Sequence, residues 1–236
     1  MPALTKPKKQ ELSIILFGRN IQNAVSSTLN SVELALSQCP NVEYELIIVD
    51  DGSDVPLNIS KEIDREIRII RHENSLGIGD ALLSGCRVAQ FENVMFLPGH
   101  NFFSNVAIEN VAKLTGYAPV ILGYRQGMDH RPAIKRVGAY IFRNILRMRI
   151  SHFLVDPHGL PVYPRAKVLE VLPAGSKHAL HIFLLSRFNR ESVVIIQTPA
   201  PINPTYSESL KAGSGAYLKY FSNICYVAKV LLFGKY

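Results

Sequence analysis

Short apolar runs that alternate with helical patterns restrict the fold of this chain more than any other feature of its sequence. Residues 12–17, 45–49 and 93–97 are rich in large apolar side chains, and each run ends in residues typical of turns. Continuous apolar runs of this length are typical of strands buried on both faces of a parallel sheet. The runs therefore predict three strands of one central sheet.

Helical patterns separate these runs. Residues 20–37 have the period of an amphipathic helix, with apolar side chains at spacings of four, three and four: Val25, Leu29, Val32 and Leu36. We expect a second helix over 80–90 and further strands over 68–71 and 193–196, the last running into a proline-rich turn at Pro199, Pro201 and Pro204. This order predicts an α/β fold, a Rossmann-like three-layer sandwich with a mostly parallel central sheet, whose ligand binds beyond the carboxyl ends of the strands.

The composition is that of a folded chain. Of the 236 residues, 47% are hydrophobic and 19% are charged, which excludes a disordered or collagen-like chain. The three cysteines lie far apart, so neither a disulfide framework nor a cysteine-rich zinc site is indicated. The formal net charge of +7 suits nucleic acid, an anionic membrane surface or phosphate-bearing substrates, and charge alone does not choose among them.

Two acidic residues and a Gly-Ser pair follow the run at 45–49: Asp50, Asp51, Gly52 and Ser53. Paired carboxylates at the carboxyl edge of a sheet suit ribose hydroxyls, a base edge or a metal ion. An ordinary Asp-Gly turn capped by Ser53 explains the same residues equally well. Both alternatives stay open from this cluster alone.

A glycine-containing segment leads into the second predicted helix. It comprises Asn74, Ser75, Leu76, Gly77, Ile78, Gly79, Asp80 and Ala81. Glycines before a helix start let a phosphate or a sugar approach backbone amides. A plain loop-to-helix cap gives a similar pattern, so the segment alone is weak support for a nucleotide site.

Together, the two clusters resemble the nucleotide-sugar half of the inverting glycosyltransferases of family 2, the group that includes the dolichyl-phosphate mannosyltransferases. In that family an Asn-containing loop, an Asp-Asp-Gly-Ser turn and an Asn-x-Gly-x-x-x-Ala helix start bind the nucleotide. The matching positions here are Asn20, residues 50–53 and residues 74–81. Downstream, an Arg-rich helix, an Asp-Pro turn and a final Lys of the family are similar to Arg131 with Arg136, Asp156 with Pro157, and Lys211.

The resemblance implies a GT-A fold and a division of the chain into three parts. We expect a basic tail over 1–10, a single glycosyltransferase domain over 11–212 and an amphipathic helix over 213–236. Within the domain, the nucleotide-sugar half covers about 11–123 and the acceptor half about 124–212.

The resemblance also implies roles for individual residues. Nucleotide-sugar binding falls to Phe17, Gly18, Asn20, Asp50, Asp51, Ser53, Asn74, Gly77, Asp80, Pro98 and Gly99. Catalysis, in the sense of stabilising the charge on the leaving diphosphate, falls to Arg131, Arg136 and Lys211. Binding of the acceptor or its phosphate falls to Arg125, Arg131 and Asp156. Arginine suits this task because its planar fork binds two phosphate oxygens at once.

The chain departs from the family at the acid-x-acid motif that binds a metal ion. Where that motif is expected, the chain has Pro98, Gly99, His100 and Asn101, without a carboxylate. The acid that commonly follows the first-loop Asn is replaced by Ile21, and an Arg of the last loop by Thr205. Mg²⁺ prefers oxygen ligands, whereas Mn²⁺ accepts imidazole more readily. Two alternatives stay open: a weak Mn²⁺ or Mg²⁺ site at His100 and Asn101, or catalysis without a metal.

The activity that the resemblance implies is inverting transfer of one sugar from a UDP- or GDP-sugar to a polyprenyl phosphate or a glycan, as in polysaccharide biosynthesis. A phosphate acceptor is already ionised at neutral pH and needs no strong general base. The missing acids keep a second interpretation open: a catalytically degenerate subunit that is a partner or regulator in a glycan-assembly complex. Nucleic acid is not expected as a partner, because the sequence has no recognition motif for it.

The carboxyl-terminal segment 213–236 combines Lys219, Lys229 and Lys235 with many apolar and aromatic residues. Its apolar stretch falls short of the roughly 20 residues that span a bilayer. Lysines beside an apolar face suit a helix that lies on an anionic membrane, and packing on the core or on a partner protein is the alternative. Because no secretion signal is apparent, we expect a cytoplasmic protein, peripheral at the inner face of the membrane.

Overall fold

The computed structural model describes residues 9–57, 59, 66–127, 140, 144, 153–170 and 180–209. Within them, one sheet has the strand order β3-β2-β1-β4-β6-β5-β7. The strands are β1 (Gln10–Gly18), β2 (Val42–Asp50), β3 (Ile67–Arg71), β4 (Asn93–Pro98), β5 (Val120–Gln126), β6 (Leu160–Pro164) and β7 (Ile195–Pro201). Strand β6 runs antiparallel to β4 and β5, and the remaining neighbours are parallel. The mostly parallel sheet that the sequence predicts is confirmed.

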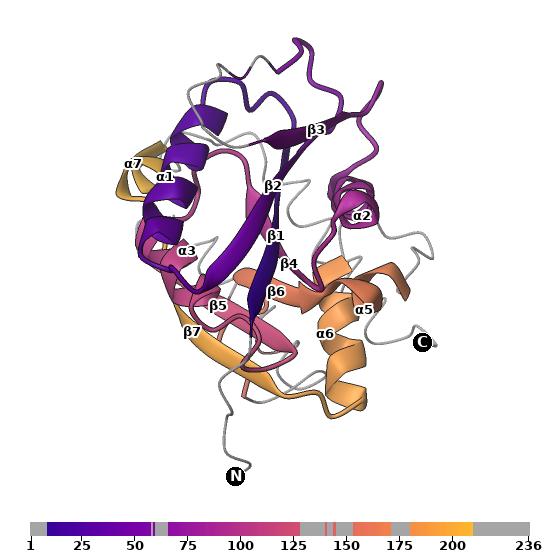
Figure 1. Ribbon diagram of the computed structural model, residues 1–236, viewed down its shortest axis with the longest axis vertical. Helices are drawn as coiled ribbons and strands as arrows, with labels where there is room; N and C mark the ends of the chain where they lie inside the picture. The colour runs from indigo at the N-terminus through magenta and orange to yellow at the C-terminus, as the bar shows by residue number, and fades with distance from the viewer. Residues whose placement is uncertain are drawn as a thin grey trace.

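Helices cover both faces of this sheet (Figure 1). Helices α1 (Val25–Ser37) and α3 (Asn105–Ala112) pack on one face. On the opposite face lie α2 (Ile78–Val88), α5 (Arg165–Glu170) and α6 (Leu180–Arg190). A short helix, α7 (Pro204–Ser209), follows β7. The predicted three-layer sandwich is therefore confirmed.

The packing of β1 explains the apolar run at 12–17. Leu12, Ile14 and Leu16 belong to the core under α1 and α3, whereas Ile15 and Phe17 belong to the core under α2. Because helices cover both faces, successive residues of this strand are buried on opposite sides. The run is continuous for that reason rather than alternating with polar residues.

Strand β7 differs from the prediction. It begins at Ile195 and continues through Pro201, so Pro199 lies inside the strand, opposite Tyr124 of β5. Since β7 is the last strand of the described sheet, one of its sides has no neighbouring strand there, and a residue without an N–H is tolerated. The predicted turn is wrong at Pro199 and Pro201, and Pro204 opens α7, a first-turn position that suits proline.

The parallel register brings the carboxyl ends of three strands to one edge. Gly18 of β1 pairs with Asp50 of β2, and the Gly18 carbonyl accepts a hydrogen bond from the N–H of Asp51 at 2.9 Å. On the other side of β1, the Phe17 carbonyl accepts one from the N–H of Gly99 at 2.9 Å. The loops that follow β1, β2 and β4 therefore start side by side.

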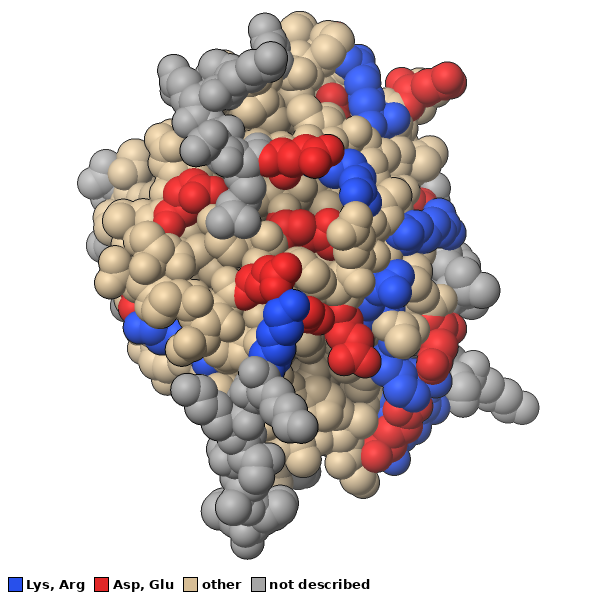
Figure 2. Space-filling model, in the orientation of Figure 1, with Lys and Arg blue, Asp and Glu red and all other residues tan. Residues whose placement is uncertain are grey.

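Acidic and basic side chains are mixed on the face shown in Figure 2. Around α5 and α6 they form ion pairs, in which Arg187 contacts Glu170 at 2.6 Å and Glu191 at 2.7 Å. This face therefore differs from the uniformly basic surface that is typical of nucleic-acid binding.

Several predicted segments lie outside the described residues. They are residues 1–8 of the basic tail, the helix over 213–236, and most of the region between β5 and β6. Among the described helices, none is long and apolar enough to cross a membrane. The division of the chain at 10, 123 and 212 stays a prediction.

Helix α2 crosses β1 at Gly85, where an added Cβ would lie 2.5 Å from Cγ2 of Ile15. We expect Gly85→Ala to destabilise the protein by about 1 kcal/mol, because overpacking at about 1–3 kcal/mol outweighs the gain of about 1 kcal/mol in helix propensity. Urea unfolding measures the difference. Ser26→Ala, on the exposed side of α1, is the matched control and should stay within about 0.5 kcal/mol of the parent protein. A Gly85→Ala variant as stable as the parent would contradict the close packing of α2 on β1.

Candidate functional site

The turn after β2 is closed by its own side chains. Asp50 is 1% exposed, and its Oδ1 accepts hydrogen bonds from the N–H of Ser53 at 2.9 Å and from the Ser53 hydroxyl. Gly52 has a φ of +71°, in the left-handed region that favours glycine. The Asp-Gly turn that the sequence allowed is therefore present, with the Asp50 carboxylate as its cap. The other carboxylate oxygen, Oδ2, is buried and has no hydrogen-bond partner in the described part of the chain.

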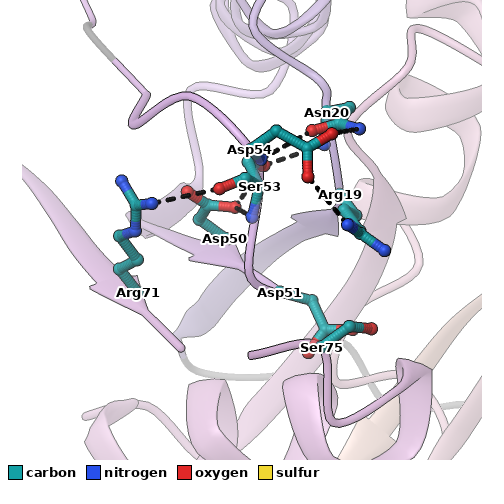
Figure 3. Close-up of polar contacts among 8 residues, drawn as sticks. All are labelled: Arg19, Asn20, Asp50, Asp51, Ser53, Asp54, Arg71 and Ser75. Atoms are coloured by element: carbon teal, nitrogen blue, oxygen red, sulfur yellow. Dashed lines mark hydrogen bonds and ion pairs between the residues drawn. The ribbon is translucent and has the colours of Figure 1, made fainter. Parts of the chain in front are cut away.

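The loop after β1 is clamped onto this turn (Figure 3). Asn20 donates from its backbone N–H to Ser53 Oγ at 2.8 Å. Its side chain pairs with Asp54 in both directions: Nδ2 donates to Asp54 Oδ2 at 2.9 Å, and Oδ1 accepts from the Asp54 N–H at 3.0 Å. Hydrogen bonds from Arg19 and Asn20 lower the pKa of the exposed Asp54 carboxyl. Both polar groups of the Asn20 side chain are thus engaged within the protein.

Asp51 points toward the glycine-containing loop that precedes α2 (Figure 3). Its Oδ2 accepts from Ser75 Oγ at 2.7 Å and from the Gly77 N–H at 3.0 Å. Its Oδ1 accepts from the Leu76 N–H at 2.8 Å and lies 2.9 Å from Nδ1 of His72. Burial alone raises the pKa of Asp51, but these hydrogen bonds together lower it below its usual value. The carboxylate therefore joins the β2 turn to the loop.

The structure places all residues predicted for nucleotide-sugar binding along this edge. Phe17, Gly18 and Asn20 lie at the end of β1; Asp50, Asp51 and Ser53 at the end of β2; Asn74, Gly77 and Asp80 at the start of α2; and Pro98 and Gly99 at the end of β4. Asn74 is exposed, and Asp80 lies in the first turn of α2, where a negative charge favours the helix. Contact between these residues and a donor stays a prediction.

Helix α1 and helix α7 hold the loop after β4. The N–H of Asn101 donates to Thr28 Oγ1 at 2.8 Å, and Asn101 Oδ1 accepts from Ser31 Oγ at 3.1 Å. The His100 ring stacks on Tyr206 with ring centroids 6.4 Å apart. Although His100 keeps an exposed surface, desolvation of its ring lowers its pKa. This environment therefore disfavours the charged imidazolium form of His100.

This loop fits a divalent cation poorly. The Asn101 amide oxygen already accepts from Ser31, and residues 98–101 include no carboxylate. The described residues contain no group of three His, Cys, Asp or Glu side chains that could hold a metal ion. An imidazole and an engaged amide oxygen do not supply the oxygen-rich set that Mg²⁺ prefers.

Arg125 and Asp156, both predicted to bind the acceptor, contact each other. Arg125 Nε lies 2.6 Å from Asp156 Oδ2, and a second guanidinium nitrogen donates to Oδ1 at 2.9 Å. Burial raises the pKa of Asp156, but the charge and hydrogen bonds of Arg125 outweigh it, and the resulting pKa is about 2. The ion pair occupies two donors of the Arg125 fork, so fewer remain for a phosphate.

The remaining predicted residues and several unpredicted ones complete the description. Arg131, Arg136 and Lys211, predicted for catalysis, lie outside the described residues. His72, Asp54 and Tyr206 take part in the site, although no motif signalled them. Asp54 directly follows the Asp-Asp-Gly-Ser cluster, and this position was the only sequence feature that could have identified it as part of the site.

A sequence model of the family described as glycosyl transferase family 2 matches residues 14–156. The matched span begins in β1, includes both motif clusters and ends at the Arg125 partner Asp156. A search of curated proteins finds no match.

Solved structures of glucosyl-3-phosphoglycerate synthase from Mycobacterium tuberculosis have a similar fold. Its complex with Mn²⁺ and UDP-glucose gives a TM-score of 0.67 at 18% identity, covering 94% of this chain and 78% of that one. Its complex with Mg²⁺ and UDP gives a TM-score of 0.66 at 18% identity, covering 94% of this chain and 78% of that one. Its complex with phosphoglyceric acid gives a TM-score of 0.64 at 20% identity, covering 94% of this chain and 79% of that one. At these identities the likeness shows the fold.

The Arg125–Asp156 pair predicts a pH-dependent contribution to stability. Asp156 has a pKa of about 2 in the folded protein, against a usual value near 3.8. The pair therefore stabilises the fold fully above about pH 4, by about 2 kcal/mol, and this contribution is lost as the pH falls toward 2. We expect Asp156→Asn to cost about that amount at pH 7 and progressively less between pH 4 and pH 3.

Urea unfolding at pH 7, 4 and 3 measures this effect. Arg125→Met is the companion variant: its cost should also fall as the pH falls, but from a higher value at pH 7, because it leaves the buried Asp156 carboxylate without its partner. A cost of Asp156→Asn that stays constant from pH 7 to pH 3 would contradict the depressed pKa.

Proposed function

This chain belongs to glycosyl transferase family 2, and we propose that it transfers one sugar from a UDP- or GDP-linked donor bound at the carboxyl edge of β1, β2 and β4. The predicted family, the GT-A type of α/β fold and the transferase class are confirmed. In the proposed reaction an acceptor oxygen bonds to the anomeric carbon from the face opposite the diphosphate. The bond from that carbon to the diphosphate breaks, and the nucleoside diphosphate leaves with the electron pair.

The observation that carries this proposal is the joining of three motif segments at one edge. The loop at Asn20, the turn at 50–53 and the loop at 74–77 contact one another through hydrogen bonds of 2.7–3.0 Å. Ligands of parallel α/β sheets bind beyond the carboxyl ends of the strands, where these loops lie. A donor at this place would also lie next to the loop after β4, because that loop starts beside β1.

A phosphate-bearing acceptor, such as a polyprenyl phosphate, is the acceptor that we propose. An ionised phosphate needs no strong general base, and the Asp51 and Asp54 carboxylates at this edge are already engaged by hydrogen bonds within the protein. The synthase from M. tuberculosis has been solved with phosphoglyceric acid, which also bears a phosphate. The basic and aromatic composition of 213–236 supports acceptor access at a membrane surface.

Cationic side chains, rather than a metal held by the loop after β4, are proposed to stabilise the leaving diphosphate. Arg131, Arg136 and Lys211 are the candidates. The synthase has been solved with Mn²⁺ or Mg²⁺ beside UDP, but residues 98–101 of this chain supply no carboxylate, and the Asn101 amide oxygen already accepts a hydrogen bond from Ser31.

A second candidate function is a non-catalytic partner or regulator in a glycan-assembly complex. Two observations favour it: the Asn20 and Asp51 side chains are engaged within the protein, and residues 98–101 carry no acid. Such a protein keeps the fold and does not turn over a donor.

Donor binding should not depend on a divalent metal. Calorimetry measures the affinities for UDP and for GDP. Each titration is done first with EDTA, then with 1 equivalent of Mn²⁺ and then with an excess of Mn²⁺. We expect the affinity of the preferred nucleotide to change by less than about threefold, because less than about 0.7 kcal/mol of binding would come from a weak metal site. His100→Ala is the matched control. A large gain on adding Mn²⁺, lost in His100→Ala, would contradict the proposal and establish a metal site at His100.

Turnover distinguishes the two candidate functions. The full-length protein is incubated with a pool of UDP- and GDP-sugars and a short polyprenyl phosphate, and mass spectrometry follows the lipid. A lipid heavier by one sugar residue supports the transferase. Donor binding without a glycosylated product, either on this lipid or on a panel of glycans, would favour the non-catalytic partner.

A further inference from the structure

The geometry points to Asp51 as a positioning residue that shapes the donor loop, residues 74–77, before any donor arrives, rather than a group that reads the nucleoside. This inference rests on the proposed donor site. It gives the carboxylate a role different from the direct contact that the motif implies.

The Asp51 carboxylate is saturated by its own protein. A carboxylate offers about four lone-pair sites on its two oxygens. Ser75 and Gly77 occupy Oδ2 at 2.7 and 3.0 Å, and Leu76 and His72 lie at 2.8 and 2.9 Å from Oδ1. The Asp51 side chain is only 9% exposed. A nucleoside would have to displace one of these contacts to reach it.

Two backbone amides of the loop depend on this carboxylate. The N–H groups of Leu76 and Gly77 point at its two oxygens, and Gly77 has a φ of +95° directly before α2 begins. Adjacent amides of a glycine-containing loop often bind a ligand phosphate. Here an internal anion binds them, so these two amides are not available to the diphosphate of a donor.

His72 ties the same carboxylate to helix α2. Its Nδ1 lies 2.9 Å from Asp51 Oδ1, and its Nε2 lies 3.0 Å from the hydroxyl of Ser84 in α2. The backbone N–H of His72 also donates to the Asp50 carbonyl at 2.9 Å. The turn after β2, the end of β3, the loop and α2 are thus linked through one buried carboxylate.

Glycine at position 52 completes the arrangement. A Cβ at Gly52 would lie 2.5 Å from the backbone nitrogen of Ser75 and 2.6 Å from the carbonyl carbon of Asn74. The turn and the loop therefore pack backbone against backbone, and Asp51 fixes the distance between them. A loop held in this way presents one shape to the donor and loses less conformational entropy when it binds.

The test measures hydrogen exchange at the amides of Leu76 and Gly77 in the donor-free protein, together with the affinities for UDP and GDP. In Asp51→Asn, an NH₂ group replaces one of the two accepting oxygens. We expect at least one of the two amides to exchange about tenfold faster or more, because a hydrogen bond to a charged group is lost. We also expect the affinity for UDP and the affinity for GDP to fall, each by a factor similar to the other.

Several variants separate this role from others. Ser75→Ala, which removes one of the four contacts, should have the same effects to a smaller extent. His72→Asn keeps an N–H that can donate to Asp51, whereas His72→Leu does not. The amide of Leu76 should therefore exchange more slowly in His72→Asn than in His72→Leu. Asp54→Asn changes a neighbouring acid of the same turn and should leave the exchange of Leu76 and Gly77 unchanged.

Unchanged amide exchange in Asp51→Asn would overturn the inference, and a loss of nucleotide affinity without faster exchange would instead indicate direct contact between Asp51 and the nucleoside. Faster exchange with both affinities intact would also overturn it, since the loop would then lie outside the donor site. If the parent protein binds neither nucleotide, the proposed function fails. The exchange rates, which need no donor, still decide whether Asp51 holds the loop.

Discussion

The parallel pairing of β1 with β2 and with β4 is the constraint on which the rest of the site depends. It sets Gly18 beside Asp50, and it extends past the strand ends through hydrogen bonds from the N–H groups of Asp51 and Gly99 to β1 carbonyls. A register shift of one residue would turn every side chain of β1 to the opposite face. The pairing of β1 with its two neighbours therefore fixes the place of each functional loop as well as the core.

Once these loops start side by side, their polar groups have to be satisfied in a small volume. Asp50 and Asp51 are 1% and 6% exposed, and a buried carboxylate is costly unless it accepts hydrogen bonds. Asp51 meets this need with donors from the following loop, whereas Asp50 accepts within its own turn through Oδ1 alone and its Oδ2 has no partner among the described residues. The Asp-Asp-Gly-Ser turn, which the family resemblance assigns to ligand binding, therefore also holds three loops together.

The strands and helices of the first hundred residues were predictable because both layers of helices bury the sheet and leave long apolar runs. Two features were not predictable: the antiparallel direction of β6 and the continuation of β7 through Pro199. The direction of a strand and its place at the sheet edge depend on pairing partners that are distant in sequence. Within the site, the residues at the strand ends followed from the motifs. His72 and Tyr206 gave no signal, because their roles arise only when β3 and α7 meet those ends.

The packing around the loop after β4, which has no acid over residues 98–101, makes this loop a poor host for a cation. Ile21 is 1% exposed and fills the space next to two glycines: a Cβ at Gly18 or at Gly99 would lie 2.5 Å from its side chain. An acid at position 21 would have to keep its charge in that apolar space, at a large desolvation cost. Since Asn101 is bound to α1 and His100 lies against Tyr206, the loop is anchored by contacts within the protein. This packing supports the proposal that side chains from elsewhere in the chain stabilise the charge on a leaving diphosphate.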